Sequence, residues 1–104
     1  MRSLMEKKKP HYSLSTIKAE FSVVGKLRMT FTATTNAEAL GFDRAGVVAV
    51  IQSITGKCFY KSMTSDHDSK IWQDVYHVPA DALVLYVKFT MSRDGHLLIS
   101  FKEK

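Results

Sequence analysis

The stretch from residue 59 to residue 76 reads FYKSMTSDHDSKIWQDVY and has the pattern of a β-hairpin. Its two ends are rich in aromatic and β-branched residues, and the polar segment between them is rich in turn-forming residues. Because side chains alternate along a strand, Lys61 is expected to share an otherwise apolar face with Phe59. Gln73 interrupts an apolar face of the second run in the same way. Such violations of a local pattern concentrate at functional sites, so this hairpin is the first candidate for function.

The chain has 104 residues, of which 45% are apolar and 24% charged, as is typical of a globular domain. We therefore expect residues 1–104 to form one domain, with residues 1–12 as a flexible basic lead-in. The first residues lack the apolar region of a secretory signal, and no apolar run is long enough to span a membrane. With a single cysteine, Cys58, these features predict a cytoplasmic protein. The net charge of +5 favours an acidic or polyanionic partner.

The first half of the chain predicts helices with one strand between them. In chain order we expect a helix over 13–24, a strand over 27–34, a short helix over 37–40 and a helix over 44–53. Ser13 or Ser15 can cap the first helix, and Asp43 can cap the last. The strand is predicted from the regular alternation of apolar and polar residues.

The second half predicts a run of antiparallel strands. After the hairpin we expect a loop over 78–81, because of its proline, and strands over 82–91 and 96–102. A two-residue loop at Asp94-Gly95 would pair Met91 with Leu98 and put the two apolar rows on different faces. A three-residue loop with Gly95 left-handed keeps both rows on one face, and a one-residue slip would reverse every side chain. The expected pairs are therefore Met91 with Leu97, Phe89 with Ile99, Val87 with Phe101, Lys88 with Ser100, and Tyr86 with Lys102.

These elements predict an α+β fold, an antiparallel twisted sheet with helices packed on one face. The other face should carry Tyr86, Lys88 and Lys102, joined by Lys61 and Gln73 if the hairpin belongs to the same sheet. Tyr60 adds an aromatic ring nearby.

Lysines and a tyrosine on one face are suited to cutting RNA without a metal. Fixed cations stabilise the negative charge of a phosphodiester transition state. Tyrosine, lysine or histidine can move protons to and from the ribose oxygens if their pKa values are pulled towards neutrality. Clustered lysines lower one another's pKa, and a tyrosine beside them is pushed towards ionisation. Aromatic rings can stack unpaired bases.

Other chemistries are less well served by the sequence. The histidines are scattered, no spacing resembles a zinc site, and no glycine-rich phosphate loop is present. We therefore expect no cofactor and no metal. His77 is a candidate proton donor, although a histidine at a strand end is more often only hydrogen-bonded.

Four motifs carry a resemblance to a known family. They are EKKKPH at 6–11, FYKSMT at 59–64, IWQDVY at 71–76 and SFKEK at 100–104. Together they are similar to the motility quorum-sensing regulator toxins, MqsR, over residues 5–104. The resemblance implies a RelE-like fold and a type II toxin that is a metal-free mRNA interferase. It implies cleavage at GC-containing triplets such as GCU, leaving 2′,3′-cyclic phosphate and 5′-hydroxyl ends.

The resemblance also implies site residues and a partner. The family's functional lysine, glutamine and tyrosine match Lys61, Gln73 and Tyr86, and its C-terminal lysine matches Lys102. The implied partner is an MqsA-like antitoxin, which itself holds zinc and supplies operator DNA binding. The chain departs from the family's pattern at 64–70, 78–85 and 93–95, and Met5 rather than Met1 matches the usual start.

Three other functions fit the same residues. One is a non-catalytic RNA-binding module that uses the basic aromatic face for affinity only. Another is a toxin of the same fold class that acts on a different target, such as DNA gyrase. The third is an interaction protein whose basic surface meets an acidic partner.

Overall fold

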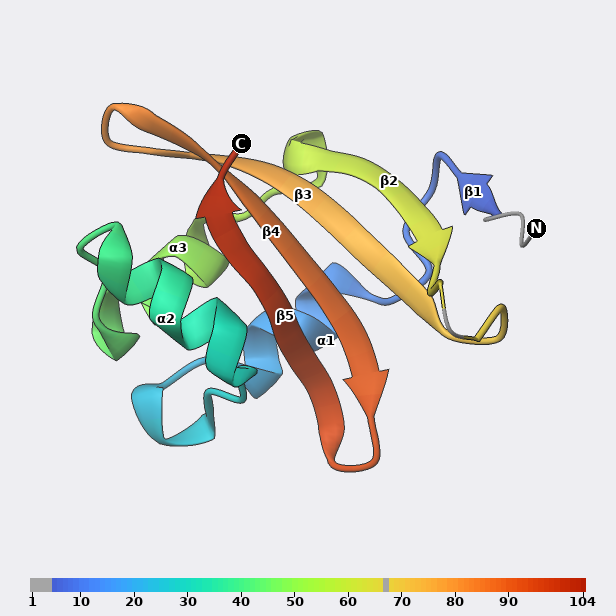
Figure 1. Ribbon diagram of the computed structural model, residues 1–104, viewed down its shortest axis with the longest axis horizontal. Coiled ribbons are helices and arrows are strands. Elements are labelled where there is room, and N and C mark those ends of the chain that lie inside the picture. The colour runs from blue at the N-terminus through green and yellow to red at the C-terminus, as the bar shows by residue number, and fades with distance from the viewer. Residues whose placement is uncertain (1–4, 67) are drawn as a thin grey trace.

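The computed structural model describes residues 5–66 and 68–104 and contains helices and a five-stranded antiparallel sheet (Figure 1). The helical elements are α1 (Leu14–Glu20), η1 (Val24–Lys26), α2 (Phe31–Ala39), α3 (Arg44–Ser53) and η2 (Gly56–Cys58). The strands are β1 (Glu6–Lys7), β2 (Phe59–Thr64), β3 (Trp72–Ala80), β4 (Leu83–Ser92) and β5 (Gly95–Glu103). They lie in the sheet in chain order, β1-β2-β3-β4-β5. The predicted α+β class is confirmed.

The core lies between one face of the sheet and the helices. Its fully buried side chains include Tyr76 of β3, Phe89 of β4 and Phe101 of β5. Phe21, directly after α1, stacks on Phe89 with a ring-centroid distance of 5.9 Å. Figure 1 shows α1 behind the strands, with α2 and α3 to the left of β5. We call the sheet face that packs against this core the inner face and the opposite one the outer face.

Two of the predicted helix starts are confirmed by their caps. The side chain of Ser13 accepts a hydrogen bond from the backbone N–H of Thr16 and begins α1. Asp43 accepts one from the N–H of Gly46 and begins α3. The first helix is shorter than predicted, because it ends at Glu20 and the chain continues through η1. No helix within the described residues is long and apolar enough to cross a membrane.

The predicted strand over 27–34 is wrong. Only Met29 forms an isolated bridge, to Leu98, and α2 starts at Phe31 because the Thr30 side chain caps it by accepting from the N–H of Ala33. The apolar and polar residues alternate, but the helix buries Ala33 and Ala37, which are four residues apart and therefore lie on one helical face. Tertiary packing of these small residues overrides the β preference of the threonines around them.

The loop predicted at Pro79 is also wrong, because β3 continues through it to Ala80. Pro79 pairs with Val84 of β4, whereas β2 pairs with β3 no further than Tyr76. Beyond Tyr76, β3 is therefore an edge strand on its β2 side, where a proline is tolerated. The turn to β4 instead contains Asp81, which adopts a positive φ of 54°.

Near the turn, the β4–β5 register matches neither of the two loops considered, because the loop consists of Arg93 and Asp94. Ser92 pairs with Gly95, so the loop has two residues rather than the predicted three, and Met91 pairs with His96. The register then shifts by one between Lys88 and Phe89, which leaves Ile99 as a bulge. Beyond the bulge the predicted pairs are confirmed: Val87 with Phe101, Lys88 with Ser100, and Tyr86 with Lys102. The predicted pairs on the loop side, Met91 with Leu97 and Phe89 with Ile99, are wrong, and Leu98 takes the core position.

The described part of the predicted flexible lead-in is ordered. Glu6 and Lys7 pair with Met63 and Ser62 as strand β1. The segment that follows is fixed by Asp74, a fully buried carboxylate on the inner face of β3. Asp74 accepts hydrogen bonds from the backbone N–H of His11 at 3.0 Å and of Tyr12 at 2.8 Å, and from the Ser62 hydroxyl at 2.6 Å. Residues 1–4 of the predicted lead-in lie outside the described residues.

A second polar cluster joins α1 to the β4–β5 turn on the inner side. Glu20 accepts hydrogen bonds from Arg28 at 2.7 Å and from the backbone N–H of His96 at 2.9 Å, and it contacts the His96 ring at 2.9 Å. Burial disfavours its charge, but the hydrogen bonds from His96 and the charge of Arg28 prevail and lower the pKa of Glu20.

Candidate functional site

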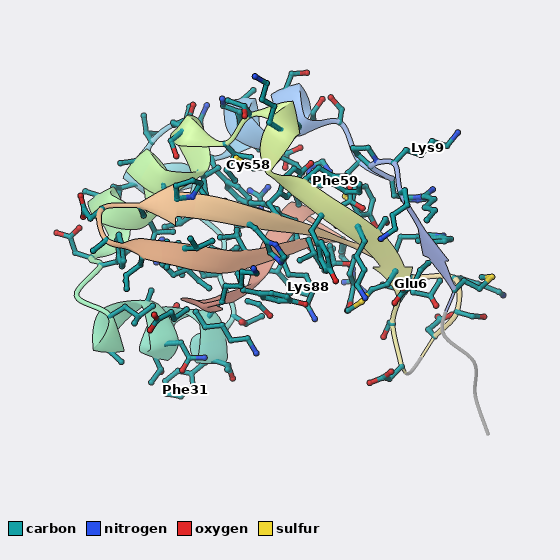
Figure 2. The ribbon with its side chains drawn as sticks, turned by 90° about the horizontal axis from the view of Figure 1, so that it is seen from above. Glu6, Lys9, Phe31, Cys58, Phe59 and Lys88 are labelled. Carbon is teal, nitrogen blue, oxygen red and sulfur yellow. The ribbon has the colours of Figure 1, made fainter. Side chains whose placement is uncertain are left out.

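The outer face of the sheet brings the predicted site residues together. Cross-strand partners in an antiparallel sheet share a face, so three rows of side chains define the outer surface. The rows are Lys61, Val75, Lys88 and Ser100; Met63, Gln73, Thr90 and Leu97; and His77, Tyr86 and Lys102. Figure 2 shows Lys88 extending from the sheet on the side away from α1. We call this surface the cationic face.

A bulge in β2 aims Lys61 at this face. Phe59 pairs with Tyr76 and Lys61 pairs with Val75, so Tyr60 is the extra residue. The bulge reverses the alternation, which lets Phe59 pack against the core while Lys61 points outwards. The prediction that Lys61 and Phe59 share a face is therefore wrong.

Lys61 is held by a carboxylate. Its Nζ lies 2.7 Å from Oε2 of Glu6, which β1 places beside β2. The hydrogen bond that Lys61 donates to Glu6 raises the pKa of Lys61, and the same contact lowers the pKa of Glu6. Lys61 therefore remains an ammonium at neutral pH. The expectation that clustering would lower the pKa of this lysine is wrong, because the contact with Glu6 raises the pKa by more than burial lowers it.

Tyr86 lies among lysines but keeps its proton. Its ring centroid is 5.2 Å from Nζ of Lys102 and 5.9 Å from Nζ of Lys88. Burial raises the pKa of Tyr86, and the charge of Lys61 opposes that change without reversing it. The expectation that the lysines would push Tyr86 towards ionisation is therefore wrong. Burial also lowers the pKa of Lys88, with help from Lys102, as expected for clustered lysines.

Tyr60 and His77 form an aromatic pair at the edge of the cationic face. Their rings stack with a centroid distance of 4.2 Å and an interplanar angle of 22°. Lys8 and Lys61 each place Nζ 5.4 Å from the Tyr60 ring centroid. His77 also pairs across the sheet with Tyr86, at a ring-centroid distance of 6.1 Å. The pair and its lysines present a half-exposed aromatic surface to a polyanion.

Gln73 lies on the same face but in a different row. It is half-buried and sits between Met63 of β2 and Thr90 of β4. Its side-chain amide makes no hydrogen bond to the residues that the structure describes, so it is available to a ligand. Within the described residues, no group of three or more histidine, cysteine, aspartate or glutamate side chains could hold a metal ion.

Sequence reasoning missed Glu6 and Lys8 as members of this site. Both belong to the segment that was expected to be flexible, and only the β1–β2 pairing brings them to Lys61 and Tyr60. The sequence offered one signal for Glu6. It is an acidic residue at the start of a basic segment, and its charge is opposite to that of Lys61.

Comparisons with known proteins agree with the motifs. The family described as "Motility quorum-sensing regulator, toxin of MqsA" matches residues 9–103. A relative named mRNA interferase toxin MqsR, from Escherichia coli (strain K12), is 43% identical over 100 residues. That alignment covers 96% of this chain and 100% of the relative. The resemblance seen in the sequence is thereby confirmed.

Proposed function

This chain belongs to the motility quorum-sensing regulator family of toxins, and from that premise we propose that it is a metal-independent mRNA interferase. The observation that carries the proposal is the cationic face, where Lys61, Tyr86 and Lys102 gather on one side of the sheet. A single-stranded RNA fits such a surface, because lysines bind its phosphates and aromatic rings stack its unpaired bases. A RelE-like architecture is part of the proposal, supported by the antiparallel sheet and the helices on its inner face.

Lys61 acts as a fixed positive charge in this proposal. Its contact with Glu6 keeps it protonated, so it suits the developing charge on the nonbridging oxygens of the phosphate better than it suits proton abstraction. Lys102 lies in the same row of the sheet as Tyr86, close to its ring, and adds a second cation to the site. Lys88 and Tyr60 extend the RNA-binding surface.

Tyr86 transfers a proton. Because burial raises its pKa, the phenol holds a proton at neutral pH and can give it to the 5′-oxygen as the P–O bond breaks. Gln73 positions the ribose or a base through its free amide. Attack by the 2′-hydroxyl then yields a 2′,3′-cyclic phosphate and a 5′-hydroxyl, at GC-containing triplets such as GCU.

The partner in this proposal is an MqsA-like antitoxin. The family is described as the toxin of MqsA, and the surplus of lysine and arginine over acidic residues favours an acidic partner. Zinc and operator DNA binding belong to the antitoxin, and the toxin would reach DNA only through it.

One long transcript tests the function. The purified chain is incubated with the RNA in the presence of EDTA, and the cut positions and end groups are mapped. Cleavage at a restricted set of triplets with cyclic phosphate ends supports the proposal. RNA that is shifted in a gel but remains whole would identify a binding module instead, and intact RNA with damaged DNA in expressing cells would point to another target.

A further inference from the structure

The residues assigned so far leave the cleavage reaction without a base. Attack by the 2′-hydroxyl needs a group that accepts its proton, and departure of the 5′-oxygen needs a group that donates one. Lys61 is kept charged by Glu6 and Tyr86 is kept protonated by burial, so both arrive as acids. Lys88 has a lowered pKa, but a lysine starts from about 10.4, roughly four units above an imidazole.

His77 is the group on the cationic face that can fill this gap. It is the direct cross-strand partner of Tyr86, and the two ring centroids lie 6.1 Å apart at an interplanar angle of 40°. Stacking on Tyr60 fixes the plane of the imidazole. Its ring nitrogens make no hydrogen bond to any residue in 5–66 or 68–104, so they are free to meet a substrate. The entering and leaving oxygens of an in-line displacement lie on opposite sides of phosphorus. His77 and Tyr86 are separate groups on one face, so one can take a proton from the entering oxygen while the other gives a proton to the leaving oxygen.

We propose that His77 accepts the proton of the attacking 2′-hydroxyl while Tyr86 protonates the departing 5′-oxygen, a proposal that rests on the ribonuclease function above. The O2′–P bond forms as the P–O5′ bond breaks. The imidazole becomes imidazolium and the phenol becomes phenolate. Water then carries the proton from His77 back to Tyr86, which restores both groups. The strand pattern and the family resemblance both indicated Lys61, Gln73 and Tyr86, whereas the sequence named His77 only as a candidate proton donor. Its role as a base comes from the geometry of this sheet.

The groups around His77 are consistent with its role as a general base. Burial and the charge of Lys104 lower its pKa, so the ring is neutral at pH 7. The titratable groups that face it are Tyr60 from β2, Tyr86 from β4 and Lys104 after β5. None of these is a carboxylate that would hold the imidazolium and trap the proton.

The matched test is His77→Phe, which keeps an aromatic ring against Tyr60 and removes the nitrogens. Single-turnover cleavage of a defined RNA is measured from pH 5 to pH 9. The wild-type rate should rise with pH below about 6.5 and then level off, as expected for a base with a lowered histidine pKa. His77→Phe should lower the rate roughly 10²–10⁴-fold and abolish that rise. His11→Phe, which changes a histidine stacked on Trp72 instead, should match the wild type.

An RNA with sulfur in place of the bridging 5′-oxygen separates the base from the acid. A thiolate leaves without protonation, so Tyr86→Phe should recover most of its rate on this substrate. His77→Phe and His77→Gln should stay slow, because the 2′-hydroxyl still needs a base. Recovery of the His77 variants to the rate of Tyr86→Phe would overturn the assignment of base and acid.

The outcome for His77 is separable from the outcome for the function. If the wild-type chain does not cut RNA at all, the ribonuclease proposal itself fails. If the wild type cuts RNA and His77→Phe does so with the same rate and the same pH profile, only the base assignment fails, and His77 is a stacking platform.

Discussion

The inner and outer faces of the sheet both carry charged side chains, but these differ in whether the protein itself supplies their partners. On the inner face, Asp74 accepts hydrogen bonds from three donor groups, and Glu20 is paired with Arg28 and His96. On the outer face, Lys88 and Lys102 form no salt bridge with any residue that the structure describes, and only Lys61 has a carboxylate partner. The two inner carboxylates are satisfied by the protein, whereas Lys88 and Lys102 on the outer face are left to be satisfied by a ligand. Substitutions on the inner face should therefore cost stability, and substitutions on the outer face should cost activity.

The largest effect should come from the outer face. Lys61→Ala removes the cation that we propose stabilises the phosphate, and Tyr86→Phe removes the proposed proton donor. Each should lower the single-turnover rate of RNA cleavage roughly 10²–10³-fold, the usual cost of one transition-state interaction. Neither should lower the melting temperature appreciably, since both groups lie away from the core.

Lys9→Ala is the matched control, because Lys9 is exposed and Figure 2 shows it pointing away from the sheet. Its cleavage rate should equal that of the wild type. Full activity of Lys61→Ala or of Tyr86→Phe would remove that residue from the mechanism.

The next largest effect should come from the inner face at Asp74. Asp74→Ala leaves the N–H groups of His11 and Tyr12 and the hydroxyl of Ser62 without their acceptor. One buried unsatisfied group costs about 1–3 kcal/mol, so we expect a loss of about 3 kcal/mol in the free energy of unfolding, measured with urea.

Asp74→Asn retains one oxygen acceptor and should lose less than Asp74→Ala. Glu38→Ala changes an exposed acidic residue on α2 and should unfold at the wild-type urea concentration. If Asp74→Ala were as stable as Glu38→Ala, the inner face would not depend on this carboxylate.

Glu20 should make stability depend on pH. Its pKa is lowered in the folded protein, so its contribution is present above the unfolded pKa of about 4.3 and is lost as pH falls through the lower folded value. Glu20→Gln should cost about 1–2 kcal/mol at pH 7, since a hydrogen bond to a charged group is lost. The stability difference between wild type and Glu20→Gln, measured by urea unfolding at pH 7 and pH 3, should narrow at the lower pH. A constant difference would contradict this role.

The smallest effect should come from Glu6, the carboxylate that pairs with Lys61 on the cationic face. Glu6→Gln removes a negative charge that competes with the RNA phosphate for Lys61. Exposed ion pairs are weak because water screens them, so RNA binding should tighten only a few-fold, measured by titration at fixed salt. Glu103→Gln, an exposed change near the end of β5, is the control for net charge. Weaker binding by Glu6→Gln would show that the carboxylate instead holds Lys61 in a binding geometry.

Much of the fold could be predicted from local chemistry. The caps at Ser13 and Asp43 mark two helix starts, and the alternation along β4 identifies its buried face, with Leu85, Val87 and Phe89. The strand over 27–34 was wrong because alternation alone does not separate a strand from a helix that buries two alanines. Neither bulge could be predicted, since an extra residue at Tyr60 or Ile99 is set by packing across the sheet.

The candidate site, like the fold, could be predicted only in part from the sequence. Lys61, Gln73 and Tyr86 stand out as polar groups in apolar strands, and they do share one face. Glu6 could not be found, because its role depends on pairing with a strand more than fifty residues away in sequence. The pKa of Tyr86 was mispredicted, because residue types reveal neighbouring charges but not how deeply the phenol is buried.

Pro79 has a consequence for the behaviour of the protein at high concentration. Where β2 ends, the last residues of β3 form an open edge, and an open edge is a template on which a second chain can add a strand. A proline offers no N–H to such a strand, so intermolecular pairing is blocked at this point. The sheet can thus keep a broad, ligand-accessible surface next to an unprotected border without inviting aggregation.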